Sequence, residues 1–162
     1  MLQTTTGKLG SDLWQALDDL ASARVYTKGS VIFEQGAVAA GVHIVEAGEV
    51  RIFLPSAHIQ SPELCGPGTI LGLSETMSGN SYRVSAVAND HATVAFIPQR
   101  KFMDFLRANC DSCMQIVRIL SEDLHGLYHK FRTVTAHPGR PRHQPDQRQV
   151  ATVAESGTHL HR

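Results

Sequence analysis

The sequence feature that most constrains the fold is a series of short apolar runs separated by glycine. From about residue 24 these runs are Val25–Tyr26, Val31–Phe33, Val42–Val45 and Val50–Leu54. Glycines fall between or beside the runs at Gly29, Gly36, Gly41 and Gly48. Glycine suits tight reversals because it tolerates positive φ. Several short strands at this spacing favour an antiparallel sandwich or roll over a parallel sheet.

Turn residues and alternation predict the remaining strands. Ala47–Glu49 predicts a compact hairpin connection, with Val50, Ile52 and Leu54 on one face of the strand that follows. Beyond it the sequence predicts a turn at Cys65–Thr69, a strand and single helical turn from Ile70 to Gly79, and strands at Tyr82–Ala88 and Ala92–Ile97.

Two helices are expected to flank these strands. Ser11 is expected to be the N-cap of the first, whose apolar stripe is Leu13, Trp14, Leu17 and Leu20. Pro98 is expected to begin the second, which carries Phe102, Phe105 and Leu106.

The most regular element is a long helix predicted over about residues 110–133. Its seam residues, Cys113, Val117, Leu120, Leu124, Leu127 and Phe131, are separated by 4, 3, 4, 3 and 4 positions. This is the a/d spacing of a coiled coil, and it predicts a homodimer through this helix. Ile116, Ile119 and Tyr128 form a second apolar flank that we expect to pack on the roll. The alternative is a helix buried wholly against its own domain.

Composition limits the class of protein. The 162 residues carry 15 basic and 15 acidic side chains, without the basic excess of a dedicated nucleic-acid binder. No apolar run is long enough to span a bilayer, and no signal peptide is recognisable. The odd cysteine count has no disulfide spacing, so a cytoplasmic location is expected. We expect a leader over residues 1–10, one domain over 11–134 and a disordered polar tail over 135–162.

The stretch Tyr26–Gly36, followed by Val42–Ile52, resembles the opening of a known domain. A Lys-Gly pair, an apolar pair, Gln-Gly and an apolar strand ending in glycine occur in the order of the cyclic nucleotide-binding domain of the catabolite-activator and fumarate-nitrate-regulator superfamily. The resemblance runs from about Leu13 to Phe131. It implies a mainly β fold, a double-stranded β-helix (jelly roll) with a short N-terminal helix and a long C-terminal dimerisation helix. It also implies a phosphate-binding cassette.

In that family the cassette contains Gly-Glu, a short helix, and Arg followed by a small hydroxyl residue. The Arg neutralises the cyclic phosphate and the Glu accepts a hydrogen bond from the ribose. The candidate ligand-binding residues here are Gly72, Leu73, Ser74, Glu75, Tyr82, Arg83, Val84 and Ser85. Leu73 stands at the Glu position, and the helical turn is expected to aim Glu75 elsewhere.

The position of the Arg depends on the register. Counting forward from Gly72, Arg83 takes the family's Arg position, whereas counting back from Ala88, Tyr82 takes it. The second register matches the apolar alternation better, and it leaves the phosphate without its cation. The cassette therefore leaves open cyclic AMP or cyclic GMP, another small effector, or no ligand.

Other candidate sites favour packing over chemistry. Cys110 and Cys113 form one Cys-x-x-Cys without the further ligands of a zinc site, so we expect a packing role. His43 lacks the His-x-His pair of a cupin metal centre, because Val45 stands two residues later, and is expected to be a satisfied or exposed side chain. His91, His125 and His129 form no ligand set, and no metal is expected.

The sequence thus predicts a non-enzymatic regulatory or sensor domain that signals through a helix dimer. No Ser-His-Asp or Cys-His order indicates nucleophilic catalysis. Direct DNA binding is not expected, because only about 28 residues follow Val134 and their composition does not favour a helix-turn-helix domain. The alternatives are a degenerate roll acting as a protein-interaction scaffold, and a remnant or truncated transcription regulator.

Overall fold

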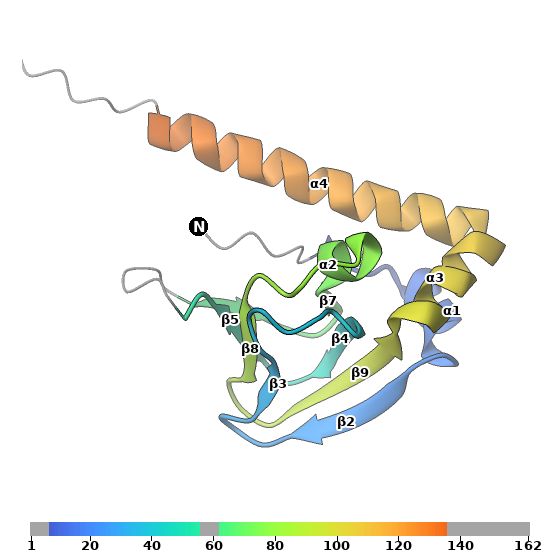
Figure 1. Ribbon diagram of the computed structural model, residues 1–162, viewed down its shortest axis with the longest axis horizontal. Coiled ribbons are helices and arrows are strands. Elements are labelled where there is room, and N and C mark those ends of the chain that lie inside the picture. Colours follow the sequence, from blue (N-terminus) through green and yellow to red (C-terminus); the bar gives the residue numbers. More distant parts are fainter. Residues whose placement is uncertain (1–6, 56–61, 136–162) are drawn as a thin grey trace, which may run out of the picture.

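Two antiparallel sheets form the body of the molecule. The computed structural model describes residues 7–55 and 62–135 (Figure 1). In the five-stranded sheet the order is β1 (Gly7–Lys8), β7 (Thr69–Leu71), β4 (Gly41–Ala47), β9 (Ala92–Pro98) and β2 (Ser22–Tyr26). In the four-stranded sheet it is β3 (Val31–Phe33), β8 (Ser85–Ala88), β5 (Val50–Phe53) and β6 (Glu63–Cys65). The predicted fold class, mainly β with flanking helices, is confirmed.

Within the described ranges, four helices accompany the sheets. They are α1 (Ser11–Asp18), α2 (Leu73–Ser78), α3 (Gln99–Ala108) and α4 (Cys110–Thr135). Helices α1, α3 and α4 contribute to an apolar layer on the outer face of the larger sheet, with Leu13, Phe102 and Ile116 among its fully buried members. A separate core fills the space between the sheets and includes Val45, Ile52 and Val94.

Strand β4 belongs to both apolar layers. Val42 and Ile44 face the helices, whereas Val45 faces the core between the sheets. His43 lies between them in the chain and shares the inner face with Val45, because successive side chains of a strand point to opposite faces. Burial on both sides explains why apolar residues occur on both faces of this strand.

Three local predictions were wrong. Ala47–Glu49 does not close a hairpin, because β4 pairs with β7 and β9 while β5 pairs with β6 and β8. The segment is a corner that carries the chain from one sheet to the other. The strand predicted at Tyr82–Ala88 begins only at Ser85. The N-cap of α1 is Gly10, and Ser11 is its first helical residue.

The expected leader over residues 1–10 is partly structured. Gly7 and Lys8 form β1 and pair with Ile70 and Thr69 of β7. A side chain at position 7 would collide with Ile119 of α4, so glycine lets the helix lie close to this strand. Residues 1–6 and the tail from 136 lie outside the described residues.

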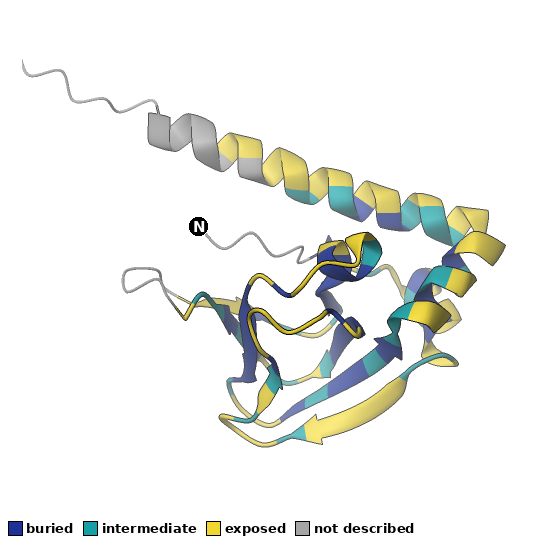
Figure 2. Ribbon diagram, in the orientation of Figure 1, coloured by how far each residue is buried: buried dark blue, intermediate teal, exposed yellow. Residues whose placement is uncertain are grey.

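Helix α4 crosses the end of the roll that carries α2 and then extends away from it (Figure 1). Ile116 and Ile119 are buried in the outer core, as the sequence predicts. Tyr128, expected on the same flank, is instead 63% exposed. It lies nine residues beyond Ile119, and most residues of α4 from Ser121 to Gly126 are already exposed (Figure 2).

The corner at Gly48 gives a stability prediction. Gly48 has φ +77° and a Cβ there would meet the carbonyl oxygen of His91, whereas Gly29 has φ +84° and open space around it. We expect Gly29→Ala to lower the free energy of unfolding by about 1–2 kcal/mol from backbone strain alone. Gly48→Ala should cost at least roughly 2 kcal/mol more, from overpacking. Urea denaturation measures both, and equal losses would contradict the close approach at the corner.

Candidate functional site

The cassette begins where β7 ends. Gly72 has a left-handed φ of 71° and serves as the N-cap of the short helix α2. A Cβ on Gly72 would lie 2.7 Å from Cε1 of Tyr82. This glycine therefore lets the backbone turn into α2 while Tyr82 packs directly against it.

Leu73 is an apolar anchor of α2. Its side chain is fully buried and belongs to the layer between the larger sheet and the helices. At the position where the resemblance implies a ribose-binding carboxylate, this chain therefore has a side chain that contributes hydrophobic stability. Ser74, the next residue, is exposed.

Tyr82 and Arg83 take opposite directions. Tyr82 is 4% exposed, and its hydroxyl donates a hydrogen bond to the carbonyl oxygen of Gly41 at 2.8 Å. Its ring stacks on Phe33 with 4.1 Å between the centroids. Arg83 is exposed. The inward position thus falls to Tyr82, which agrees with the register counted back from Ala88.

Val84 and Ser85 of the cassette make contacts within the fold. Val84 is buried in the core between the sheets. The hydroxyl of Ser85 accepts a hydrogen bond from the backbone N–H of Gln35 at 3.0 Å. The Ser85 hydroxyl, a candidate ligand-binding group in the sequence, therefore fixes the loop after β3.

Glu75, also a candidate cassette residue, is a buried carboxylic acid. Burial raises its pKa, while its own backbone N–H and the charge of Arg83 act in the opposite direction. Its Oε2 has no hydrogen-bond partner among the described residues. An acid in this setting cannot supply the positive charge that a phosphate needs.

A cavity of about 620 Å³ lies beside Tyr82. Its walls come from β2, β3, the loop after β3, β4 and β9, and Tyr82 is its one contribution from the candidate cassette residues. Tyr26, Phe33, Tyr82 and Phe96 contribute aromatic rings, and Arg24 and Glu34 contribute charges. The site lies in the size range of small-molecule pockets.

His43 lines this cavity from β4. Its side chain is 6% exposed, and Nδ1 has no hydrogen-bond partner among the described residues. The imidazole lies 4.9 Å from the ring of Phe96 and 5.1 Å from that of Phe33, between centroids. Burial, assisted by the charge of Arg24, lowers the pKa of His43 to about 4. The ring is therefore neutral at pH 7.

The expectation of a satisfied or exposed His43 was wrong. The alternation of side chains along a strand could have indicated the position of His43. Arg24 and Tyr26 lie on one face of β2, and His43 lies on the inner face of β4. Pairing of Arg24 with Val94 and of His43 with Phe96 brings these positions to one side of the sheet. The pairing partners were not visible in the sequence.

The structure divides the predicted seam residues of α4. Cys113 and Leu120 are partly buried against the outer core, whereas Val117 and Leu124 are exposed. The side chains of Leu127 and Phe131 lie outside the described residues. Two further exposed apolar residues, Met114 and Tyr128, were not among the seam residues.

Cys110 and Cys113 occupy the first turn of α4. Cys110 is exposed and Cys113 packs against the outer core. Within residues 7–55 and 62–135, no three His, Cys, Asp or Glu side chains are grouped to hold a metal ion. No described helix is long and apolar enough to cross a membrane.

The double-sheet roll, the Gly72–Ala88 segment and the long C-terminal helix define a class of regulatory ligand-binding domains. The model of the cyclic nucleotide-binding domain matches residues 23–109, more than half of the chain, and the chain belongs to this family.

Solved structures with the same fold come from bacterial regulators. The catabolite activator protein of Thermus thermophilus has a TM-score of 0.69 and 20% identity, over 78% of this chain and 61% of that one. A transcriptional regulator of Thermotoga maritima has a TM-score of 0.67 and 19% identity, over 76% and 98%. The sensor domain of the Pseudomonas aeruginosa regulator DNR has a TM-score of 0.60 and 18% identity, over 75% and 83%. The chain thus spans about three-fifths of the Thermus protein. No curated protein matches it.

The buried imidazole predicts a specific pH dependence of stability. Unfolded His43 takes up a proton near pH 6.5, but folded His43 does so only near pH 4, so protonation favours unfolding between these values. We expect this residue to lower the free energy of unfolding by as much as roughly 3 kcal/mol as the pH falls from 6.5 to 4. Urea denaturation at pH 7 and pH 4 measures the loss.

His43→Gln should remove this component, whereas His91→Gln, at an exposed position, should keep it. The same decline in both variants would mean that His43 is not the group responsible. An NMR titration of the histidine ring protons provides the pKa directly.

Proposed function

We propose that this chain is a non-enzymatic regulatory module whose cassette does not bind a cyclic nucleotide and whose α4 pairs with a second copy. The main support is the orientation of two cassette residues: Tyr82 is buried and points inward, whereas Arg83 is exposed. A cyclic phosphate held there would lie beside a stacked ring and a hydroxyl already bonded to Gly41.

Electrostatics argue against a phosphate at this place. Moving an anion out of water costs several kcal/mol in real proteins unless a cation and hydrogen bonds replace the solvent. Arg83 is too exposed to provide that pairing inside the roll, and Glu75 carries the wrong sign. Leu73 offers no acceptor for a ribose hydroxyl.

The pairing surface on α4 is proposed from its exposed apolar stripe. Met114, Val117, Leu124 and Tyr128 are spaced by 3, 7 and 4 residues, so they share one side of the helix. Ile116 and Ile119 anchor the other side to the roll. A helix with two apolar sides needs a second partner, and the heptad spacing favours an identical helix.

A protein-interaction scaffold is the second candidate. The filled cassette favours it, because Leu73 and Tyr82 take up the space beneath Gly72–Ala88. The cavity beside Tyr82 argues for a small effector instead. Ligand binding at that cavity separates the two functions.

Isothermal titration calorimetry tests the cassette. We expect no saturable binding of cyclic AMP or cyclic GMP at roughly 1 mM nucleotide, a concentration that would detect dissociation constants far weaker than the micromolar range. Arg83→Ala should behave as the wild type does. Micromolar binding that Arg83→Ala abolishes would contradict the proposal, because it would show Arg83 reaching into the roll.

Light scattering after size exclusion tests the pairing. The wild type is expected to run as a dimer, and Leu124→Asp as a monomer, because a carboxylate in a coiled-coil seam must be desolvated. Glu122→Lys is the control, since two residues correspond to about 200° around the helix and place the charge on the other side. Glu122 is exposed. A monomeric wild type, or equal effects of both variants, would contradict this seam.

A further inference from the structure

The cavity beside Tyr82 is a different site from the cassette around α2. It extends on the side of β2, β3 and the loop after β3, whereas α2 contributes nothing to its walls and Tyr82 is the one candidate cassette residue among them. Strand β2 is an edge strand of the larger sheet, which leaves this side of the roll uncovered by a further strand. A ligand could therefore occupy it without displacing Leu73 or any other residue of α2.

The walls suit a flat ring. Phe33 stacks on Tyr82, and both rings border the cavity together with Tyr26 and Phe96. Aromatic walls of this kind bind planar rings by offset stacking and edge contacts as well as by burial of apolar area. Val31 and Ile32 add aliphatic surface to the same walls.

His43 provides an unused polar atom at the inner end. Its side chain is more than nine-tenths buried and borders the cavity, and Nδ1 lacks a partner among the described residues. A buried polar atom without a hydrogen bond lowers stability by about 1–3 kcal/mol. A bound polar group that pairs with Nδ1 would remove this cost.

Arg24 provides a charge near that atom. It lines the cavity, and its positive charge acts on the imidazole of His43. The described residues contain no salt bridge to Arg24. Arg24 is exposed, and its guanidinium lines the same cavity as the neutral imidazole without an anion among the described residues. It therefore matches a carboxylate at the solvent-accessible part of the wall, which can accept two parallel hydrogen bonds from arginine.

We propose that this cavity binds a small planar aromatic carboxylate, with the ring between Tyr26, Phe33, Tyr82 and Phe96 and the carboxylate beside Arg24 and Nδ1 of His43. Glu34 also borders the cavity and disfavours a second negative charge. The ligand is therefore a monoanion, unlike a nucleotide with its phosphate and ribose. This proposal goes beyond the function proposed above and does not depend on pairing of α4.

The test titrates the full chain with indole-3-acetate and follows the backbone amide signals by NMR. We expect saturable shifts concentrated on β2, β3, β4 and β9, with a dissociation constant on the order of 0.1–1 mM for a probe of this size. Tryptamine, which has the same ring and the opposite charge, should bind at least about tenfold more weakly. Absence of saturation at roughly 10 mM, or shifts confined to α2 and α4, would overturn the proposal.

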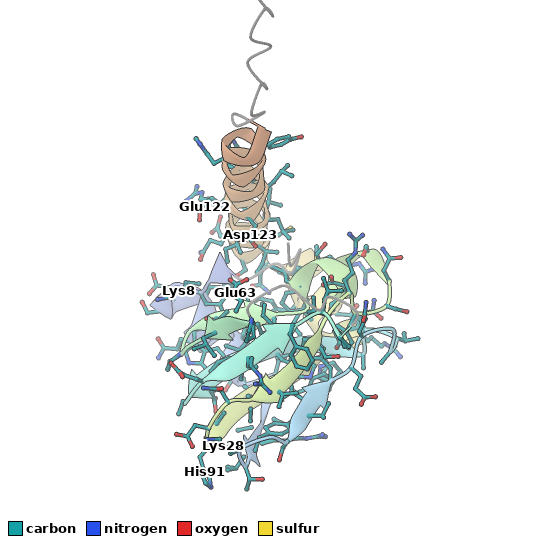
Figure 3. The ribbon with its side chains drawn as sticks, turned by 90° about the vertical axis from the view of Figure 1, so that its left-hand side faces the viewer. Lys8, Lys28, Glu63, His91, Glu122 and Asp123 are labelled. Carbon is teal, nitrogen blue, oxygen red and sulfur yellow. The ribbon has the colours of Figure 1, made fainter. Side chains whose placement is uncertain are left out.

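Single substitutions test the polar contacts. Arg24→Gln should weaken indole-3-acetate at least about fivefold, and Glu34→Gln should strengthen it slightly, because each changes the charge beside a carboxylate. Lys28→Gln is the matched control, since Lys28 is exposed and lies at the end of the roll away from α4, outside the cavity (Figure 3). His43→Phe keeps a ring but removes Nδ1 and should weaken binding about threefold. Equal affinities of the Arg24→Gln and Lys28→Gln variants would refute the assigned carboxylate position.

Discussion

The packing of Tyr82 against Phe33 and Gly72 is the contact on which the rest of the site depends. The Tyr82 ring stacks on Phe33, its hydroxyl donates to Gly41, and Gly72 leaves room for it at the start of α2. One side chain thus joins the end of β7, the beginning of β4 and the end of β3. The Tyr82 ring packs against Gly72 of the candidate cassette and also forms a wall of the aromatic cavity. The proposed loss of phosphate binding and the presence of this cavity would therefore share one physical cause.

Strand β4 connects that cavity to the helical layer. His43 borders the cavity, while Val42 and Ile44, its immediate neighbours, pack in the layer that contains Phe102 and Ile116. Interiors are close-packed, so a shift of a buried strand is felt by the residues on its other face. A ligand beside His43 would therefore affect the apolar layer against which α4 packs, through strand β4 alone. Such a coupling is what the proposed regulatory function requires, since a ligand shifts an equilibrium only through differential contacts with two states.

Prediction succeeded for local patterns and failed for pairing partners. The strands from Val31 to Phe53, the short helix α2 with its C-cap at Gly79, and the burial of Ile116 and Ile119 followed from short-range periodicity and turn residues. The hairpin at Ala47–Glu49 failed because a glycine turn and a corner between sheets have the same local sequence. His43 was misjudged because its exposure depends on Phe33, Tyr82 and Phe96, which come from three other parts of the chain.

The sequence by itself determined the class of fold, the packing of Ile116 and Ile119 of α4 on the roll and the presence of Leu73 where the family has a carboxylate, because each depends on residue type or on spacing within one element. It left two registers for Arg83. Only the tertiary structure decided between them, since β8 begins at Ser85 and the direction of residue 82 is set by the ring of Phe33 and the carbonyl of Gly41. The same long-range packing created the cavity, because its walls are adjacent only after the two sheets face one another.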